Sequence, residues 1–351
     1  MASDRPTLDT VAAVAGVSRM TVSNAYNRPD QLSAATRERV LAAAATLGYA
    51  GPDPTAASLR RQRTGTIGVI LTERLPYAFT DPGMVEILRG MTTELSDAGM
   101  SLLLVPESGG EDDSSNRTAE LLRHAMVDAL VLCSLDPGDP AVAAAQERKV
   151  PLVTIGHPKL PHVPMVGIDN EKTAAMVAPY LYGLGHRRFA VLTVGAGIYG
   201  IRNRPGFISR PSGFIDELTR LGVKAEDVVI CEASEHSRSA GKAAVGALLA
   251  TPTKKRPTAL FAVTDILALG AMDAAAGAGV DVPGELSIAG IDDIPDAAAA
   301  SPPLTTIDQE LFEQGRAAIR LALRQLAGEP VRAPRTKTEL LVRGSTAAPP
   351  R

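Results

Sequence analysis

The sequence contains no tryptophan, only 3% aromatic residues and two cysteines among 351 residues. Cys133 and Cys231 lie far apart in apolar segments, so we expect reduced thiols and no disulfide framework. No stretch approaches the roughly 18 apolar residues of a membrane-spanning helix, and the N-terminus is polar, unlike a secretory leader. These absences predict a cytoplasmic protein without a membrane partner.

Signatures of catalysis and metal binding are also missing. The sequence has no Walker A loop, no H-E-x-x-H and no G-x-S-x-G motif, and its five histidines are dispersed, which predicts no metal site. A G-x-G-x-x-G string at 195–200 matches the dinucleotide fingerprint, but loop residues follow where a helix must begin. We therefore expect no catalytic residues and no cofactor, and we keep a nucleotide-cofactor enzyme as an alternative.

The composition is that of a globular protein of two or three domains, with 45% hydrophobic residues. Charge is distributed unevenly along the chain. Residues 1–63 hold eight Arg, no Lys and five acids, a net charge of +3, whereas the whole chain carries −3. A mildly basic head on an acidic body suits a DNA-binding head.

The N-terminal segment has the pattern of three short helices. Leu8, Val11, Ala12 and Ala15 recur at i, i+3, i+4 and i+7, which forms one apolar helical stripe. Gly16 then supplies the left-handed residue that commonly ends a helix.

The second helix, about 19–26, turns only Val22 and Ala25 inward and leaves a polar face free. Such a face after a tight turn is what a reader of the DNA major groove needs. A third helix follows, with Ser33 as its cap and Gly48 at its end.

The strings AGVSRMTVSNAYN and LSAATRERVLAAAATLGY in this segment resemble the headpiece of the LacI–GalR family of bacterial repressors. The resemblance implies that Arg19, Met20 and Asn24 contact base edges. It places the contacts to the DNA backbone at Thr7, Ser18, Thr21, Ser23 and Asn27. Thr10 stands where the family usually has Asp, and Asn24 where it usually has Arg, so the preferred operator is expected to differ from the common one.

Residues 51–64 read either as a flexible linker or as a hinge helix that begins at Asp53 and Pro54. The resemblance implies a hinge that folds on operator DNA, pairs with its dimer mate and enters the minor groove through Ala56 and Leu59, with Leu59 as the wedge. Arg60 and Arg61 are expected to contact phosphates.

The remainder alternates apolar, strand-like runs with helical segments, the pattern of parallel sheets covered on both faces. The expected strands are 66–72, 101–106, 128–134, 151–156, 188–194, 227–232, 258–264 and 286–292. Eight strands and a break near 157–170 predict two doubly wound lobes.

This body is similar to the periplasmic-binding-protein fold of the same family, on segments such as GLGHRRFAVL, VTDILALGAM and PPLTTIDQ. The expected domains are a helix-turn-helix headpiece (1–50), a hinge (51–64), an α/β body (65–343) and a tail (344–351). Within the body we expect the first lobe at about 66–160 and 310–330, and the second at about 161–308 and 337–343.

Ligands of such folds bind between the lobes, at the carboxyl ends of strands. Strand ends and the resemblance together indicate the effector-binding residues Tyr77, Phe79, Asp81, Arg210, His236, Thr264, Asp265, Asp292 and Gln309. For Asp265 and Asp292 the alternative is a structural role in capping a helix or turn. These groups suit a polyhydroxylated ligand, while Arg202 and Arg204 in the 195–209 loop leave an anionic sugar phosphate open.

The resemblance implies a DNA-binding transcriptional regulator, most simply a repressor. Its expected partners are a palindromic double-stranded operator, a small-molecule effector and a second copy of the chain in a homodimer. A transport-type sugar-binding protein is the other alternative, and the DNA-binding head argues against it.

The wedge role of Leu59 is directly testable. Leu59→Ala should weaken binding to the operator far more than binding to unrelated DNA, because only the kinked operator complex receives the side chain. Gel-shift titrations on both duplexes measure this. Equal losses on the two would refute the wedge.

Overall fold

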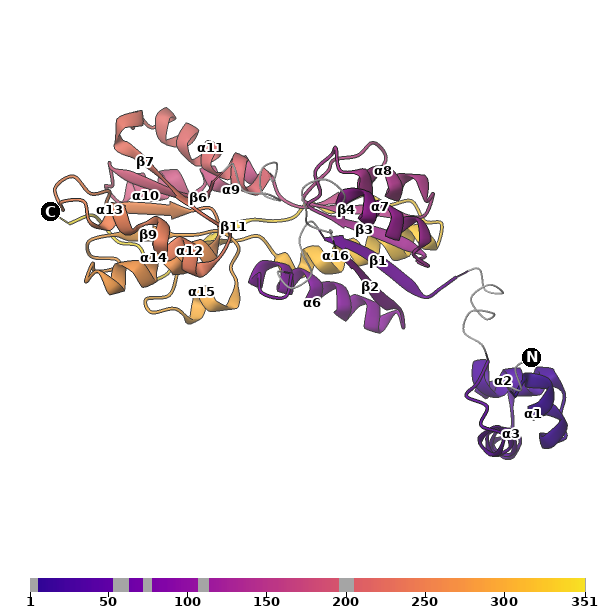
Figure 1. Ribbon diagram of the computed structural model, residues 1–351. Helices are drawn as coiled ribbons and strands as arrows, with labels where there is room; N and C mark the ends of the chain where they lie inside the picture. The colour runs from indigo at the N-terminus through magenta and orange to yellow at the C-terminus, as the bar shows by residue number, and fades with distance from the viewer. Residues whose placement is uncertain (1–5, 53–62, 72–77, 107–113, 196–204, 351) are drawn as a thin grey trace. The chain divides into compact units, whose positions relative to one another are not determined.

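The computed structural model describes residues 6–52, 63–71, 78–106, 114–195 and 205–350. The chain forms two compact units, residues 1–65 and 66–351. The first is all-helical and the second is built on parallel sheets (Figure 1), which confirms the fold class expected from the sequence. Among the described residues no helix is long and apolar enough to cross a membrane.

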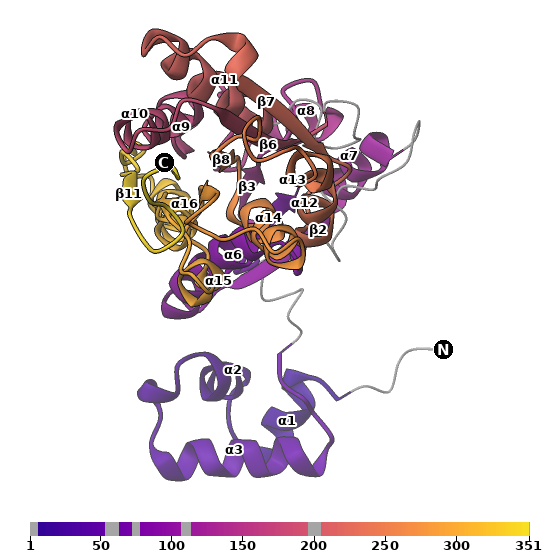
Figure 2. The same ribbon diagram turned by 90° about the vertical axis from the view of Figure 1, so that its left-hand side faces the viewer.

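The first unit contains α1 (Leu8–Ala15), α2 (Arg19–Asn27) and α3 (Ala34–Thr46), with one 3₁₀ turn at Pro29–Gln31. Figure 2 shows α3 running across the other two helices. Gly16 ends α1 in the left-handed conformation at φ 64°. The core consists of small and branched apolar side chains from all three helices: Leu8, Val11, Ala12, Ala15, Val22, Ala25, Val40, Ala43 and Ala44.

The structure explains why a threonine can stand at position 10. The Thr7 backbone N–H donates to Thr10 Oγ1 (2.7 Å), and the Thr10 N–H donates back to Thr7 Oγ1 (3.3 Å). This reciprocal capping box satisfies two backbone donors at the start of α1. A threonine can therefore close the first turn where the family usually has an aspartate.

The first lobe of the second unit is a five-stranded parallel sheet in the order β2-β1-β3-β4-β5. Its strands are β1 (Thr66–Leu71), β2 (Ser101–Pro106), β3 (Ala129–Cys133), β4 (Leu152–Ile155) and β5 (Met165–Val166). One face is covered by α6 (Pro82–Asp97) and α16 (Leu311–Leu326), and the other by α7 (Ser114–His124) and α8 (Pro140–Glu147).

The second lobe is a four-stranded parallel sheet in the order β7-β6-β8-β9. Its strands are β6 (Phe189–Val194), β7 (Val228–Ala233), β8 (Ala259–Ala262) and β9 (Ser287–Ala289), next to the antiparallel pair β10 (Thr306–Asp308) and β11 (Glu339–Leu341). The helices of this lobe are α9 (Asn170–Ala175), α10 (Val177–Gly183), α11 (Pro205–Arg220), α12 (Arg238–Ala244), α13 (Gly246–Leu249), α14 (Asp265–Gly277) and α15 (Pro295–Ala299).

The chain passes between the lobes three times: after β5, between β10 and α16, and between α16 and β11. The eight expected strands agree with β1–β4 and β6–β9 to within three residues at each end. The first sheet, however, continues to β5, beyond the boundary near 160 suggested by the sequence. That strand has only two residues, which are too few to show a recognisable pattern of apolar residues in the sequence.

Helix α11 begins at Pro205, inside the 195–209 segment that the sequence predicts to be a loop. Pro205 and Gly206 favour a loop, but a proline is tolerated in the first turn of a helix. In the structure Pro211 lies inside the helix. Arg210 therefore projects from a helix.

The C-terminal segment is part of the second lobe and not a free tail from residue 344. The Ile288 N–H donates to the Ser345 carbonyl (2.8 Å), and the Thr305 N–H donates to Ser345 Oγ (2.8 Å). Ser345 is fully buried. The segment consists mostly of Ser, Thr, Ala and Pro, a composition typical of a tail. In the structure, however, its serine hydroxyl and its backbone accept hydrogen bonds from N–H groups at the edge of the sheet.

Helices α6 and α16 pack at backbone distance through two glycines. A Cβ atom at Gly90 would overlap the carbonyl oxygen of Phe312, and one at Gly315 would overlap that of Ile87. This close approach lets α16, which is distant in sequence, cover the first sheet.

Gly90→Ala should therefore destabilise the second unit by about 1–3 kcal/mol, the usual cost of overpacking. Gly277→Ala is the matched control, because Gly277 is exposed at the end of α14 with open space around the site of a Cβ. Chemical denaturation should show no loss for the control. Equal midpoints for the two variants would contradict the packing argument.

Candidate functional site

The exposed face of α2 carries the three residues predicted to read bases. Arg19 is the first residue of the helix, Met20 is 68% exposed, and Asn24 lies one turn later. Arg19 Nη1 lies 3.6 Å from Asp9 Oδ2 on α1.

The residues predicted to contact the DNA backbone also hold the helix ends. Ser18 Oγ accepts the Thr21 N–H (3.1 Å) and lies 2.9 Å from Thr21 Oγ1. Asn27 Nδ2 donates to the Ser23 carbonyl (3.0 Å). Like the Thr7 cap, these contacts are exposed and preserve the shape of the surface that contains α2. The predicted hinge and phosphate residues Ala56, Leu59, Arg60 and Arg61, and Tyr77 of the predicted effector site, lie outside the described residues.

The second unit contains a cavity of about 160 Å³ lined by residues of both lobes, which we call the interlobe cavity. Asp81, Ser134 and His157 line it from the first lobe. Arg210, His236 and Asp292 are among the residues that line it from the second. Several of these follow parallel strands, as expected for ligand sites of doubly wound folds.

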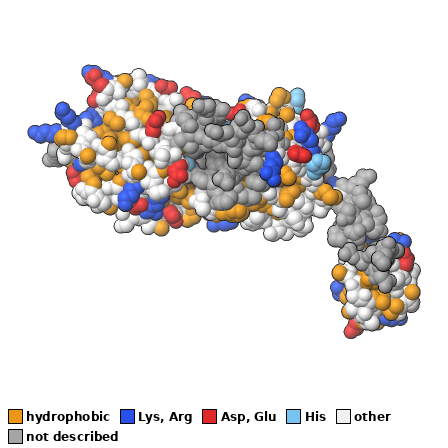
Figure 3. Space-filling view, viewed as in Figure 1, with side chains coloured by type: hydrophobic (Ala, Val, Ile, Leu, Met, Phe, Trp, Pro, Cys, Tyr) orange, Lys and Arg blue, Asp and Glu red, His pale blue; other side chains and the backbone are white. Residues whose placement is uncertain are grey.

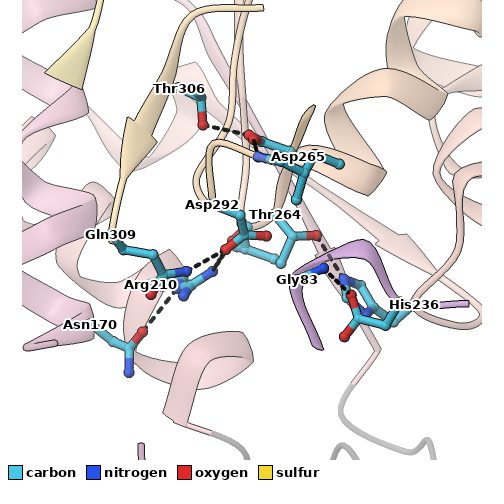
Figure 4. Close-up of polar contacts among 12 residues, drawn as sticks. Gly83, Asn170, Arg210, His236, Thr264, Asp265, Asp292, Thr306 and Gln309 are labelled. Atoms are coloured by element: carbon cyan, nitrogen blue, oxygen red, sulfur yellow. Dashed lines mark hydrogen bonds and ion pairs between the residues drawn. The ribbon is translucent and has the colours of Figure 1, made fainter. Parts of the chain in front are cut away.

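Arg210 and Asp292 form the polar centre of this cavity. Arg210 Nη1 lies 3.2 Å from Asp292 Oδ1, and both side chains are largely buried, with exposed fractions of 8% and 12%. Arg210 also donates through Nε to Asn170 Oδ1 (2.9 Å) and through Nη1 to the Val263 carbonyl (2.6 Å). Gln309 Nε2 donates to the same Asp292 oxygen (2.5 Å; Figure 4). The network fixes the guanidinium in one orientation.

Opposing effects act on the pKa of Asp292. Burial raises its pKa to about 6, the nearby Asp81 carboxylate adds to the rise, and Arg210 opposes it. The backbone of Asp292 is also unusual, with φ at 139°.

Asp265 has a different environment. It is fully buried; Oδ1 accepts the Thr306 hydroxyl (2.5 Å) and Oδ2 accepts the Ile294 N–H (3.2 Å). It is not among the residues that line the interlobe cavity. Burial raises its pKa well above the ordinary value. These contacts correspond to the structural alternative considered for Asp265.

The remaining predicted effector residues divide into two groups. His236 Nε2 and Thr264 Oγ1 are 2.9 Å apart, and both line the cavity. Asp81 lines it and caps α6 by accepting the Gly83 N–H (3.0 Å). Phe79 is 60% exposed and is not part of the lining.

Four polar residues of the lining are not among the predicted effector residues, namely Ser134, His157, Asn170 and Gln314. Ser134 directly follows β3 and His157 follows β4 closely, so the rule that ligands bind at strand ends would have found both. Asn170 begins α9, just after the first passage between the lobes. Among the described residues, no group of three or more His, Cys, Asp or Glu side chains could hold a metal ion.

Comparison with known proteins agrees with both units. Residues 7–51 match the family described as bacterial regulatory proteins, lacI family, and residues 166–346 match the periplasmic binding protein-like domain. An HTH-type transcriptional regulator of Mycobacterium tuberculosis is 41% identical, over 99% of this chain and 98% of its own. The HTH-type transcriptional repressor CytR of Escherichia coli is 33% identical, over 98% and 97% of the two chains.

Solved structures show the same similarity. The lac repressor dimer bound to operator and an anti-inducer gives a TM-score of 0.79 at 26% identity, covering 98% of this chain and 100% of that one. The complex of the regulator CelR with cellobiose gives 0.67 at 31% identity, covering 97% and 100%. The chain belongs to the LacI family. It is a DNA-binding transcriptional regulator, and relatives named as regulators agree with the expectation that it is not an enzyme.

The raised pKa of Asp292 predicts a pH dependence of stability. An unfolded Asp titrates near pH 3.9, so between that value and about 6 the native state binds more protons and the free energy of unfolding falls as pH rises. Asp292→Asn should reduce this slope, by on the order of 2–3 kcal/mol across the interval, and leave the part that arises from Asp265.

Denaturation at several pH values between 4 and 7 measures the slope. Asp216→Asn, at an exposed position on α11, is the control and should leave it unchanged. A slope in the Asp292 variant as steep as that of the wild type would show that Asp292 titrates normally.

Proposed function

We propose that this regulator is a repressor that binds a palindromic operator as a homodimer, and that a small polyhydroxylated effector in the interlobe cavity controls its affinity for DNA. The observation that carries the proposal is the buried Arg210–Asp292 pair, which lies in a cavity lined by both lobes of a chain with a DNA-binding headpiece. A ligand held there contacts both lobes at once. Its binding free energy can therefore favour one arrangement of the lobes.

The chemistry of the cavity favours an uncharged effector. Arg210 is already paired with Asp292, and Asp81 adds a second carboxylate to the lining. The described lining therefore offers no excess positive charge for a phosphate, which argues against the sugar phosphate left open by the sequence. Paired carboxylate, guanidinium and amide groups suit sugar hydroxyls, and the related CelR structure contains cellobiose.

On the DNA side, we propose that Arg19, Met20 and Asn24 read bases while the caps of α1 and α2 contact phosphates. A dimer places two such helices in successive major grooves, about 34–36 Å apart. The hinge residues Ala56 and Leu59 then enter the minor groove between them, and Arg60 and Arg61 contact phosphates. On the face of the second unit seen in Figure 3, described acidic and basic side chains are interspersed, so this face has no broad basic field for DNA.

Regulation then follows from linkage. The effector and the operator each favour one arrangement of the lobes, and each binding event changes the affinity for the other ligand by the same factor. The site of action is the cytoplasm, where operator DNA and metabolites are both present.

Selection of operators from random duplexes by the full-length protein tests the DNA half of the proposal. A palindromic site bound with a steep salt dependence is expected. A thermal-shift screen of neutral sugars and their phosphates then identifies the effector, because a bound ligand raises the melting temperature.

With operator and effector in hand, Arg210→Ala should abolish the response to effector, a change of at least tenfold in operator affinity, and leave ligand-free operator binding intact. Arg220→Ala is the matched control on the same helix, because Arg220 is exposed and pairs only with Glu217 among the described residues. Calorimetric titration and gel shifts measure both steps. A normal response in the Arg210 variant would refute the proposed site.

A further inference from the structure

The geometry of the headpiece points to Asp9 as a positioning residue for sequence-specific DNA recognition. We propose that the Asp9 carboxylate holds one terminal nitrogen of Arg19 and thereby presents the rest of the guanidinium to a guanine. This inference rests on the proposed role of Arg19 as a base-reading residue.

The two residues connect the scaffold helix with the recognition helix. Asp9 is the second residue of α1, on the side opposite the buried stripe, and Arg19 is the first residue of α2. The gap between Asp9 Oδ2 and Arg19 Nη1 is 3.6 Å, with side-chain exposures of 67% and 64%. Only the turn at Gly16–Ser18 separates the two helices: Gly16 caps the end of α1 and Ser18 caps the start of α2.

The pair is too exposed to matter much for stability, because water and salt screen the attraction between surface charges. The pair does, however, affect the orientation of the Arg19 side chain before DNA binds. An arginine side chain has many rotamers and loses much of this freedom when it binds a base, and a guanine is read through two parallel N–H donors aimed at O6 and N7. A carboxylate that restricts the side chain before binding lowers the entropy cost of that contact.

Asp9 contacts only one of the three nitrogens of the Arg19 guanidinium. Asp9 lies beside Nη1, and within residues 6–52 no hydrogen bond to Nε or Nη2 of Arg19 is observed. The Nε–Nη2 edge therefore remains available as a bidentate donor. Asp9 also places negative charge beside the proposed DNA surface, where it opposes contacts between Arg19 and phosphates. Both effects favour the bidentate base contact over nonspecific backbone contacts.

The test compares full-length wild type with Asp9→Asn, Asp30→Asn, Arg19→Ala and the Asp9→Asn/Arg19→Ala double variant. Asp30 is a second exposed carboxylate of the headpiece, in the 3₁₀ turn, so its variant makes the same charge change without touching Arg19. Fluorescence anisotropy at fixed salt gives the dissociation constants for the operator selected by wild type and for a scrambled duplex. Circular dichroism melting shows that each headpiece remains folded.

Asp30→Asn should strengthen binding to both duplexes equally, because it only removes repulsion from phosphates. Asp9→Asn should lower the ratio of operator to scrambled affinity by about three- to tenfold relative to that control, part of the discrimination that a bidentate contact provides. Operators reselected with Asp9→Asn should lose a guanine preference at one position in each half-site. In the Arg19→Ala background the Asp9 change should have no further effect on the ratio.

The proposal is overturned if Asp9→Asn behaves like Asp30→Asn, or if it lowers the ratio equally when Arg19 is absent. A wild-type protein that selects no operator at all would instead refute the proposed operator recognition, and the positioning role with it.

Discussion

The buried ion pair between Arg210 and Asp292 is the interaction on which the interlobe cavity depends. The arginine comes from α11 and the aspartate from the segment after β9, and their pairing draws in Asn170, Val263 and Gln309. Neither charge is stable alone in such a setting, because removal of one partner from a buried pair typically costs 3–5 kcal/mol. The pair therefore fixes the local geometry in the absence of ligand.

A second buried carboxylate, that of Asp265, stabilises the segments that carry this ion pair. Asp265 binds Thr306 of β10 and the backbone of Ile294, the segments next to Gln309 and Asp292. Gly290 leaves room for this carboxylate, which a Cβ at that position would overlap. Asp292 and Asp265 belong to neighbouring strand ends but differ in role, since one lines the cavity and the other holds its wall in place.

The sequence was informative where a residue's neighbours in space are also its neighbours in the chain. Helix periodicity, the cap at Ser33 and the apolar strands were all visible locally. The cavity was visible in part, because strand ends and family resemblance located Arg210 and Asp292. The remaining features depend on distant contacts. The two-residue β5 exists only through its pairing with β4, and the buried role of Ser345 exists only because β9 lies beside it.

The path of the chain between the lobes also has a consequence for biosynthesis. Helix α16 covers one face of the first sheet, and residues 339–347 complete the edge of the second lobe. Both elements follow the other strands and helices of the body in the sequence, so neither sheet can be fully covered until residues 311–347 have left the ribosome. The headpiece, complete by residue 50, has its own core and can form first. Nascent chains that stall before residue 311 would thus carry a folded DNA-binding unit on a body whose two sheets are not yet covered.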